Sequence, residues 1–174
     1  NAGNISDYVD ISTGGNDNYV DYISSLNPIV YYRLDEDSGS VATDVTGTLD
    51  GSYTGSSPLY GQAGFNASVS NEAIGFDGTA DEVVLTPDSS IFDTTQGTVS
   101  AWFNVDNMSR DHAVFSKDGN GDVDGQFYVG VDSNGDIYGR LQQDGTFSNL
   151  SFDPTAAIGE KIQAGEWYML TMTY

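Results

Sequence analysis

The spacing of apolar side chains along this chain changes near Pro28. Before that point four apolar residues recur at helical spacing: Tyr19, Val20, Ile23 and Leu26. This spacing predicts a short helix over 18–26, with Asp17 or Asn18 as its cap. The helix is expected to end before Pro28, because the residue that precedes a proline avoids helical backbone. From residue 29 onward the apolar positions alternate, which indicates β-strands.

Two segments show this alternation most clearly. In the first, residues 98–105, one face is apolar: Val99, Ala101, Phe103 and Val105. The second, residues 126–142, contains two alternating runs separated by Ser133-Asn-Gly, which predicts a hairpin. Its expected buried face consists of Phe127, Val129, Val131, Ile137 and Leu141, and its opposite face carries Tyr128, Tyr138 and Arg140. With Asp-Gly or Asn-Gly turn signals recurring along the chain, the pattern predicts an antiparallel sandwich.

The charge of the chain is strongly one-sided. Among 174 residues there are 26 acidic and five basic side chains, for a net charge of −21, and 21 of the acids are Asp. Such a surface repels phosphates, so we expect no binding to nucleic acid and no electrostatic docking on anionic membranes. No apolar run is long enough for a spanning helix, so we expect no membrane insertion. The absence of Cys excludes disulfides and thiolate metal sites.

Five motifs follow one another in a characteristic order: residues 28–44 (PIVYYRLDEDSGSVATD), 73–78 (AIGFDG), 98–105 (TVSAWFNV), 115–117 (FSK) and 167–174 (WYMLTMTY). Together they resemble a laminin G-like domain of the concanavalin A-like lectin/glucanase superfamily. The resemblance implies an all-β fold, an antiparallel β-sandwich of the jelly-roll type. We expect a polar arm or linker over 1–16, a short helix over 17–27 and the sandwich over 28–174.

The resemblance also implies further strands after the strand that begins at Trp167. In the family this strand is followed by several others, whereas the sequence stops at Tyr174. A final strand without a partner would leave an apolar edge exposed, which soluble proteins avoid. We therefore expect the remaining strands to come from a longer polypeptide or from a neighbouring subunit.

Calcium is the cofactor that the sequence favours most. Oxygen ligands alternate along one acidic loop: Asp118, Asn120, Asp122 and Asp124. Hard cations prefer such ligands, although the loop is not an EF-hand, since Val123 holds the required glycine position. The alternative is an ordinary acidic turn that needs no metal. The family resemblance implies a second set of candidate ligands: Glu36, Asp44, Asp77 and Asp81.

A second candidate site would bind a saccharide. Sugars stack on aromatic rings and form hydrogen bonds with amide and guanidinium groups. Each sugar-binding pocket contains only a few such polar groups. The residues that offer this chemistry are Trp102, Tyr128, Tyr138, Arg140 and Gln142. They could serve if their face of the sheet is open. If that face is covered, Trp102 is a core residue instead.

No catalytic residues are expected. His112 is the single histidine, and it has no serine-nucleophile motif beside it. Glycoside hydrolysis needs two carboxylates, but the Glu-x-Asp-x-x-Glu strand of the family's glucanases is absent. We therefore expect that the protein is not an enzyme.

Two functional classes remain open. The first is an extracellular or cell-surface recognition and adhesion module that binds a glycan or another surface ligand with the help of calcium. The second is a structural component of an assembly, such as a virion decoration, fibre or tail protein or an extracellular filament subunit. The partners of such a component would be neighbouring subunits. This class stays open because the version of the motif over 28–53 resembles domains of phage and bacterial surface proteins.

Overall fold

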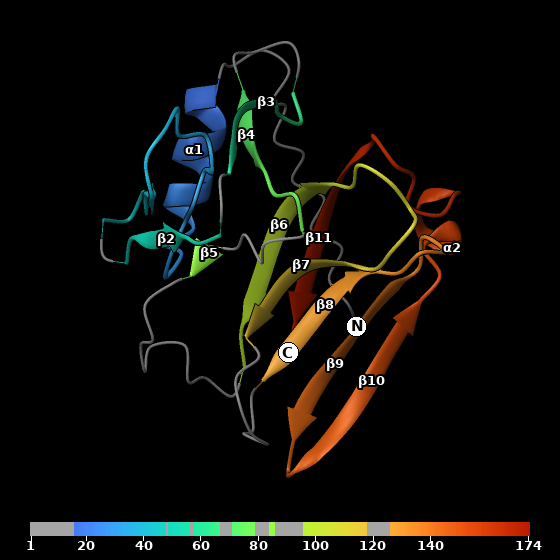
Figure 1. Ribbon diagram of the computed structural model, residues 1–174. Helices are drawn as coiled ribbons and strands as arrows, with labels where there is room; N and C mark the ends of the chain where they lie inside the picture. Colours follow the sequence, from blue (N-terminus) through green and yellow to red (C-terminus); the bar gives the residue numbers. More distant parts are fainter. Residues whose placement is uncertain are drawn as a thin grey trace. The chain divides into compact units, whose positions relative to one another are not determined.

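The computed structural model describes residues 16–47, 49–55, 58–66, 71–78, 84–85, 96–117 and 126–174. The chain forms two compact units, Asn1–Ser89 and Ser90–Tyr174. Antiparallel strands, drawn as arrows in Figure 1, occur in both units and make up most of the second. The expected all-β fold class is confirmed. No helix in the described ranges is long and apolar enough to cross a membrane.

The described part of the first unit contains one helix and five short strands. They are α1 (Asn16–Ser25), β1 (Val41–Ala42), β2 (Gly51–Tyr53), β3 (Leu59–Ala63), β4 (Glu72–Gly75) and β5 (Val84–Leu85). One sheet has the order β1-β2-β5, and β3 pairs with β4 in a second sheet. Turns and an isolated bridge, rather than long ladders, connect the short strands of this part of the chain.

Helix α1 confirms the helix predicted from the apolar spacing. It begins at Asn16, slightly earlier than either predicted cap, and ends at Ser25, three residues before Pro28. Asn27 takes a left-handed backbone conformation (φ 52°), which stops the helix. The ring of Tyr19 packs edge-on against Phe65, with the two centroids 5.6 Å apart.

The alternating residues after Pro28 do not form the strand that their pattern predicts. Among the described residues of this segment, only Tyr32 makes a ladder contact, an isolated antiparallel bridge to Asp44. Leu34 has a positive φ of 57°, a left-handed conformation that is unusual for a residue other than glycine. A strand cannot continue through it, so the segment runs as a loop into β1.

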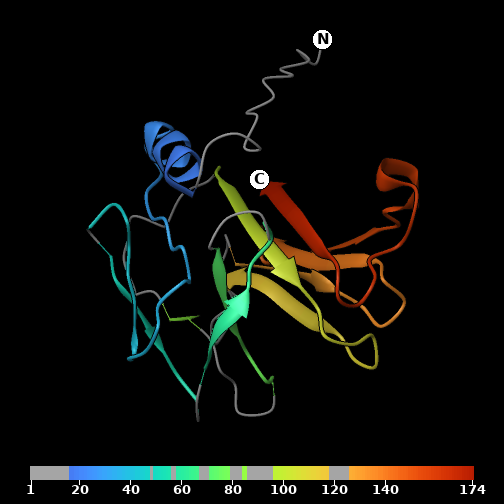
Figure 2. The same cartoon turned by 90° about the horizontal axis from the view of Figure 1, so that it is seen from above.

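Among its described residues, the second unit contains six longer strands and a helical turn. They are β6 (Thr98–Asn104), β7 (His112–Lys117), β8 (Phe127–Val131), β9 (Ile137–Gln143), β10 (Thr146–Phe152), α2 (Thr155–Ile158) and β11 (Trp167–Thr173). Four strands form a sheet in the order β10-β9-β8-β7, while β6 and β11 form an antiparallel pair. Figure 2 shows this pair in one layer and the four-stranded sheet in the other.

The apolar core of this unit lies between the two layers. Its buried members are Val105, Val129, Val131, Ile137 and Ile162. Phe103, Phe115, Tyr168, Leu170 and Met172 are among the partly buried residues packed against them. The predicted hairpin is confirmed in its register, because Phe127 lies opposite Leu141 and Val131 opposite Ile137. The residues predicted to face the core on 98–105 are likewise buried or partly buried.

Aspartates build the turns at both ends of β9. Between β8 and β9, Asp132 accepts hydrogen bonds at Oδ1 from the backbone N–H groups of Asn134 (2.8 Å) and Asp136 (3.0 Å). Burial alone would raise the pKa of Asp132, but these hydrogen bonds and Lys161 outweigh it and lower the pKa. Between β9 and β10, Asp144 and Gly145 both have positive φ, the backbone of a tight two-residue hairpin turn.

Candidate functional site: the outer face of the four-stranded sheet

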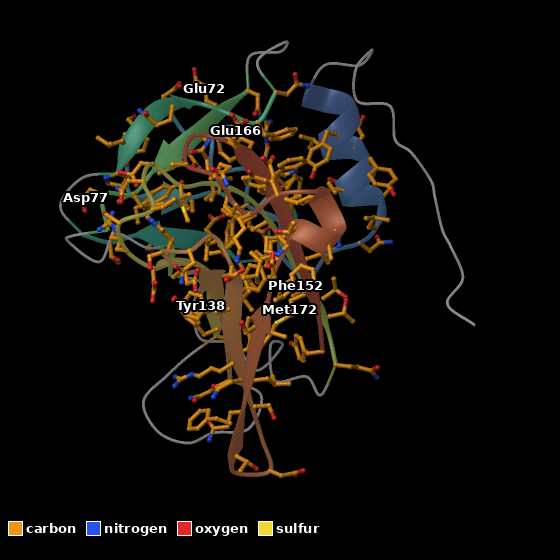
Figure 3. The ribbon with its side chains drawn as sticks, turned by 90° about the vertical axis from the view of Figure 1, so that its right-hand side faces the viewer. Glu72, Asp77, Tyr138, Phe152, Glu166 and Met172 are labelled. Atoms are coloured by element: carbon orange, nitrogen blue, oxygen red, sulfur yellow. The ribbon has the colours of Figure 1, made fainter. Side chains whose placement is uncertain are left out.

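The face of the four-stranded sheet that points away from the core carries the candidate recognition residues. We call it the outer face and define it by Tyr128, Tyr138, Arg140, Gln142 and Phe147. Strand pairing gathers them, because Tyr128 lies opposite Arg140 and Gln142 opposite Phe147. Since side chains alternate along a strand, these residues point away from Val129, Ile137 and Leu141. Figure 3 shows Tyr138 on the opposite side of the sheet from Phe152.

Tyr128 and Tyr138 form a pair at the centre of this face. Their hydroxyls are hydrogen-bonded to each other, and their ring centroids lie 5.3 Å apart at an interplanar angle of 50°. Burial, and then the hydrogen bond with Tyr128, raises the pKa of Tyr138 well above its ordinary value. The Tyr138 hydroxyl is therefore protonated at neutral pH and can donate as well as accept hydrogen bonds.

Gly130 makes room for the tyrosine pair. It lies opposite Tyr138 in the neighbouring strand. A Cβ atom at this position would come within 2.2 Å of the carbonyl oxygen of His112 and 3.1 Å of the hydroxyl of Tyr128. Any larger residue would therefore push β7 or the Tyr128 ring aside. The glycine allows close packing of β7 on β8 beneath the two rings.

Arg140 and Phe147 form a second pair on the outer face. The guanidinium carbon of Arg140 lies 4.8 Å from the ring centroid of Phe147, a cation–π contact. Phe147 is 44% exposed, so the stacked pair offers an aromatic edge and a planar cation to solvent. Phe147 is absent from the residues predicted from the sequence. The Asp144-Gly145 turn could have revealed it, since a two-residue turn fixes Phe147 opposite Gln142.

Gln142 is the most unusual residue of the outer face. Its side chain is 1% exposed, and neither atom of its amide, Nε2 or Oε1, has a hydrogen-bond partner in the described structure. An unpaired buried amide costs roughly 1–3 kcal/mol, and such groups are rare in folded proteins. This burial corrects the expectation that the Gln142 side chain lies on an open surface. Its amide is shielded from solvent.

Trp102 does not belong to this group. It lies on β6, in the other layer, between the neighbours Ala101 and Phe103 that face the core. Its cross-strand neighbour is Met169, which is 54% exposed. Because outward residues of the two layers point in opposite directions, Trp102 is on the far side of the unit from Tyr128 and Tyr138. The structure therefore separates it from the four other residues of the predicted saccharide site.

Among the predicted calcium ligands, Asp44 is buried and enclosed by hydrogen-bond donors. Its Oδ1 accepts from the backbone N–H groups of Tyr31 (2.9 Å) and Thr46 (3.0 Å). Its Oδ2 accepts from the N–H of Leu49 (3.0 Å) and the hydroxyl of Thr46 (2.5 Å). Burial would raise the pKa of Asp44, but these hydrogen bonds outweigh it and lower the pKa far below its ordinary value. This geometry ties Tyr31 to the turn that contains Asp44, Thr46 and Leu49.

Glu36 also has hydrogen-bond partners in the first unit. Its Oε1 accepts from the backbone N–H of Thr43 (2.7 Å) and its Oε2 from the hydroxyl of Tyr53 (2.5 Å). Burial, and then the Glu36 contact, raises the pKa of Tyr53. Asp77 is exposed. The five other candidate ligands lie outside the described residues: Asp118, Asn120, Asp122, Asp124 and Asp81.

Within the described ranges no group of three or more His, Cys, Asp and Glu side chains is arranged to hold a metal ion. The calcium hypothesis therefore stays a prediction. His112 lies with Nε2 2.6 Å from the carbonyl oxygen of Asn107, which ties the loop before β7 to that strand.

The comparison with protein families agrees with this architecture. The family model described as the concanavalin A-like lectin/glucanases superfamily, of laminin G type, matches residues 77–174, more than half of the chain. The chain therefore belongs to this superfamily. The match includes all of the outer-face residues and begins later than residue 28, where the motif resemblance starts. Searches of curated proteins and of solved structures find no match to the chain.

Proposed function

We propose that the protein is a non-catalytic recognition module that binds a saccharide on its outer face. Membership of the superfamily supports a binding module in general, because laminin G-like domains of this kind are mostly non-catalytic. The saccharide, as the particular ligand, is supported by the side chains gathered by β8, β9 and β10. A fold of this class hosts many functions, so the argument rests on these side chains.

The observation that carries the proposal is the solvent-exposed stack of Arg140 and Phe147, with the Gln142 amide buried next to it. The exposed Phe147 ring can stack on the apolar face of a sugar ring, and Arg140 can donate hydrogen bonds from its edge. A carboxamide offers two donors and two acceptor lone pairs in one plane, which matches the neighbouring hydroxyls of a sugar ring. The Gln142 amide has no hydrogen-bond partner among the described residues, and it would reach a sugar only after the side chains around it move apart.

We further propose that calcium stabilises the module and that it acts outside the cell or on a cell surface. The aspartate-rich composition, the Asp118–Asp124 loop and the net charge of −21 support this. The loop precedes β8, the strand that carries Tyr128.

A glycan array tests both proposals when it is probed with and without a chelator. We expect the intact chain to bind a restricted set of glycans and to bind them more weakly after chelation. Phe147→Ala and Arg140→Ala should each weaken binding by at least ~10-fold, about 1.4 kcal/mol. Met169→Ala is the matched control, because Met169 is equally exposed but lies in the other layer. No binding in either condition by a folded protein would exclude the saccharide function.

A second candidate function is a structural role in an assembly such as a virion or an extracellular filament. The observation that favours it is the uncharged outer edge of the second unit, since β10 and β11 contain no charged residue. Analytical ultracentrifugation of the intact chain tests it. A stable, concentration-dependent oligomer would favour this role, whereas a monomer at high micromolar concentration would count against self-assembly.

A further inference from the structure

We propose that Tyr128 and Tyr138 are a site of oxidative modification, at which a carbon–carbon bond joins the two rings as dityrosine. The oxidant is hydrogen peroxide, which acts through a haem peroxidase. The cross-link ties β8 to β9 covalently on the outer face of the sheet. This modification does not depend on saccharide binding, because it needs only the two tyrosines and the oxidant.

The two rings meet at their reactive ends. Their hydroxyls are hydrogen-bonded to each other, and their centroids lie 5.3 Å apart at an interplanar angle of 50°. In a tyrosine ring the ortho carbons flank the carbon that bears the hydroxyl, and they carry much of the unpaired electron after oxidation. Contact between the hydroxyls therefore places an ortho carbon of each ring next to the other ring.

The fold holds the rings in this position. Tyr138 lies opposite Gly130, two residues along β8 from Tyr128, so the tyrosines are diagonal neighbours across two paired strands. Both strands lie inside the four-stranded sheet, between β7 and β10. Gly130 leaves space for the pair, since a Cβ atom there would come within 3.1 Å of the Tyr128 hydroxyl. Radicals on the two rings therefore meet without diffusion, which raises their effective concentration.

The reaction is complete with the two phenols and peroxide. Each phenol gives up one electron and its hydroxyl proton and becomes a phenoxyl radical. The two radicals join through one ortho carbon each. Each joined carbon then releases its hydrogen as a proton, and each phenolic oxygen takes up a proton, which restores both aromatic rings and both hydroxyls. The protein loses two hydrogen atoms in total, and hydrogen peroxide takes up their electrons and protons to form two water molecules.

The composition of the chain favours this product. The sequence has 11 Tyr and no Cys, so the chain has no thiol that could reduce the radicals and no disulfide that could join its strands. Tyr128 and Tyr138 are both partly exposed, which lets them pass electrons to an oxidant at the surface. A covalent link between strands stabilises the fold by restricting the unfolded chain, as a disulfide does.

A tyrosine pair in the first unit provides the contrast. Tyr53 and Tyr60 have ring centroids 6.2 Å apart, and their rings are nearly perpendicular, at 88°. The Tyr53 hydroxyl donates a hydrogen bond to the Glu36 carboxylate. The Tyr60 hydroxyl donates to the backbone carbonyl of Gly39. Because the hydroxyls bond to different groups, no hydroxyl contact holds the ortho carbons of these two rings together.

Oxidation of the intact chain tests the proposal. The protein, at low concentration, is treated with hydrogen peroxide and a haem peroxidase, cleaved before its Asp residues and analysed by mass spectrometry. This cleavage places Tyr128 in peptide 124–131 and Tyr138 in peptide 136–143. We expect a joined peptide that is lighter than the sum of the two by two hydrogen atoms. It should be at least ~10-fold more abundant than the product that joins any other two tyrosines.

Two variants locate the cross-link. Tyr138→Phe keeps the ring but removes the phenol, so the joined peptide should disappear. Tyr60→Phe is the matched control, because it removes one phenol from the contrasting pair and should leave the joined peptide unchanged. If Tyr138→Phe does not fold, the unmodified chain still decides. Its yield of joined peptide should fall at least ~10-fold when the chain is unfolded in urea before oxidation, because the rings are then no longer held together.

Three results would overturn the proposal. The first is the absence of the joined peptide under conditions in which free tyrosine forms dityrosine. The second is an equal yield of the joined peptide from the folded and the urea-unfolded chain. The third is a set of cross-links that join separate chains and never the two tyrosines of one chain. None of these results bears on glycan binding, so the two proposals fail separately.

Discussion

Asp44 and Gln142 are both buried polar side chains, but the two units of the molecule surround them differently. Asp44 is 2% exposed, and its two carboxylate oxygens accept four hydrogen bonds from Tyr31, Thr46 and Leu49. Gln142 is 1% exposed, and its amide has no hydrogen-bond partner in the described structure. At nearly the same degree of burial, the hydrogen-bonded Asp44 carboxylate stabilises the first unit, whereas the Gln142 amide, without partners among the described residues, destabilises the second.

The difference separates a residue whose polar atoms build the fold from one whose amide makes no hydrogen bond to the described residues. The Asp44 carboxylate replaces regular strand pairing in a part of the chain with few ladder contacts, because the backbone N–H groups of Tyr31, Thr46 and Leu49 converge on it. Gln142 lies in a regular strand whose backbone is already paired with β8 and β10. Its side chain adds nothing to that ladder, and ligand recognition is the role that we propose for its buried amide.

The largest expected effect is that of Asp44→Asn. The substitution removes the negative charge and turns two of the acceptor positions into donors that face N–H groups. We expect the free energy of unfolding to fall by roughly 3–5 kcal/mol, because several buried donors lose their acceptor. Denaturant unfolding measures this loss. Asp37→Asn, at an exposed position of the same segment, is the control and should change stability by less than ~0.5 kcal/mol.

Acid should reveal the same contrast through pH dependence. The pKa of Asp44 is lower in the folded chain than in the unfolded chain, where it is near its ordinary value of about 4. The unfolded state therefore takes up the proton first, and the stability from Asp44 is complete above about pH 4 and is lost as the pH falls below it. Denaturant unfolding between pH 6 and pH 2 measures this decline.

Asp132 shifts in the same direction in the second unit, so part of the acid effect will remain without Asp44. The Asp44→Asn variant should consequently lose less stability between pH 6 and pH 2 than the unmodified chain does. Parallel pH curves for the two proteins would show that the Asp44 carboxylate does not contribute to acid sensitivity.

The smallest expected change is a gain in stability from Gln142→Met. Methionine has a similar length and flexibility but no group that needs a hydrogen bond, so the variant should be about 1 kcal/mol more stable. Glycan binding should fall at the same time. Gln62→Met, at an exposed position of β3, is the matched control for stability. A loss of stability in Gln142→Met would show that the buried amide is a structural group after all.

The elements that local patterns specify were predicted well. The helix at Asn16–Ser25, the β8–β9 hairpin and its two faces follow from periodicity and turn residues, which act over a few positions. The segment after Pro28 was predicted less well. Its alternation indicates a strand, but the left-handed Leu34 and the distant donors around Asp44 override it. Those contacts join residues up to 13 apart, beyond the reach of a local pattern.

The sequence by itself determined the alternation of β8 and β9, and with it the outward direction of Tyr128, Tyr138 and Arg140. It also carried the motifs of the superfamily and the acidic surface. Only the tertiary structure decided that Trp102 belongs to the other layer, that Phe147 joins Arg140 and that the Gln142 amide is buried without a partner. The physical reason is that alternation fixes the face of a strand, whereas strand order and packing between layers fix which faces meet and which side chains lose contact with water.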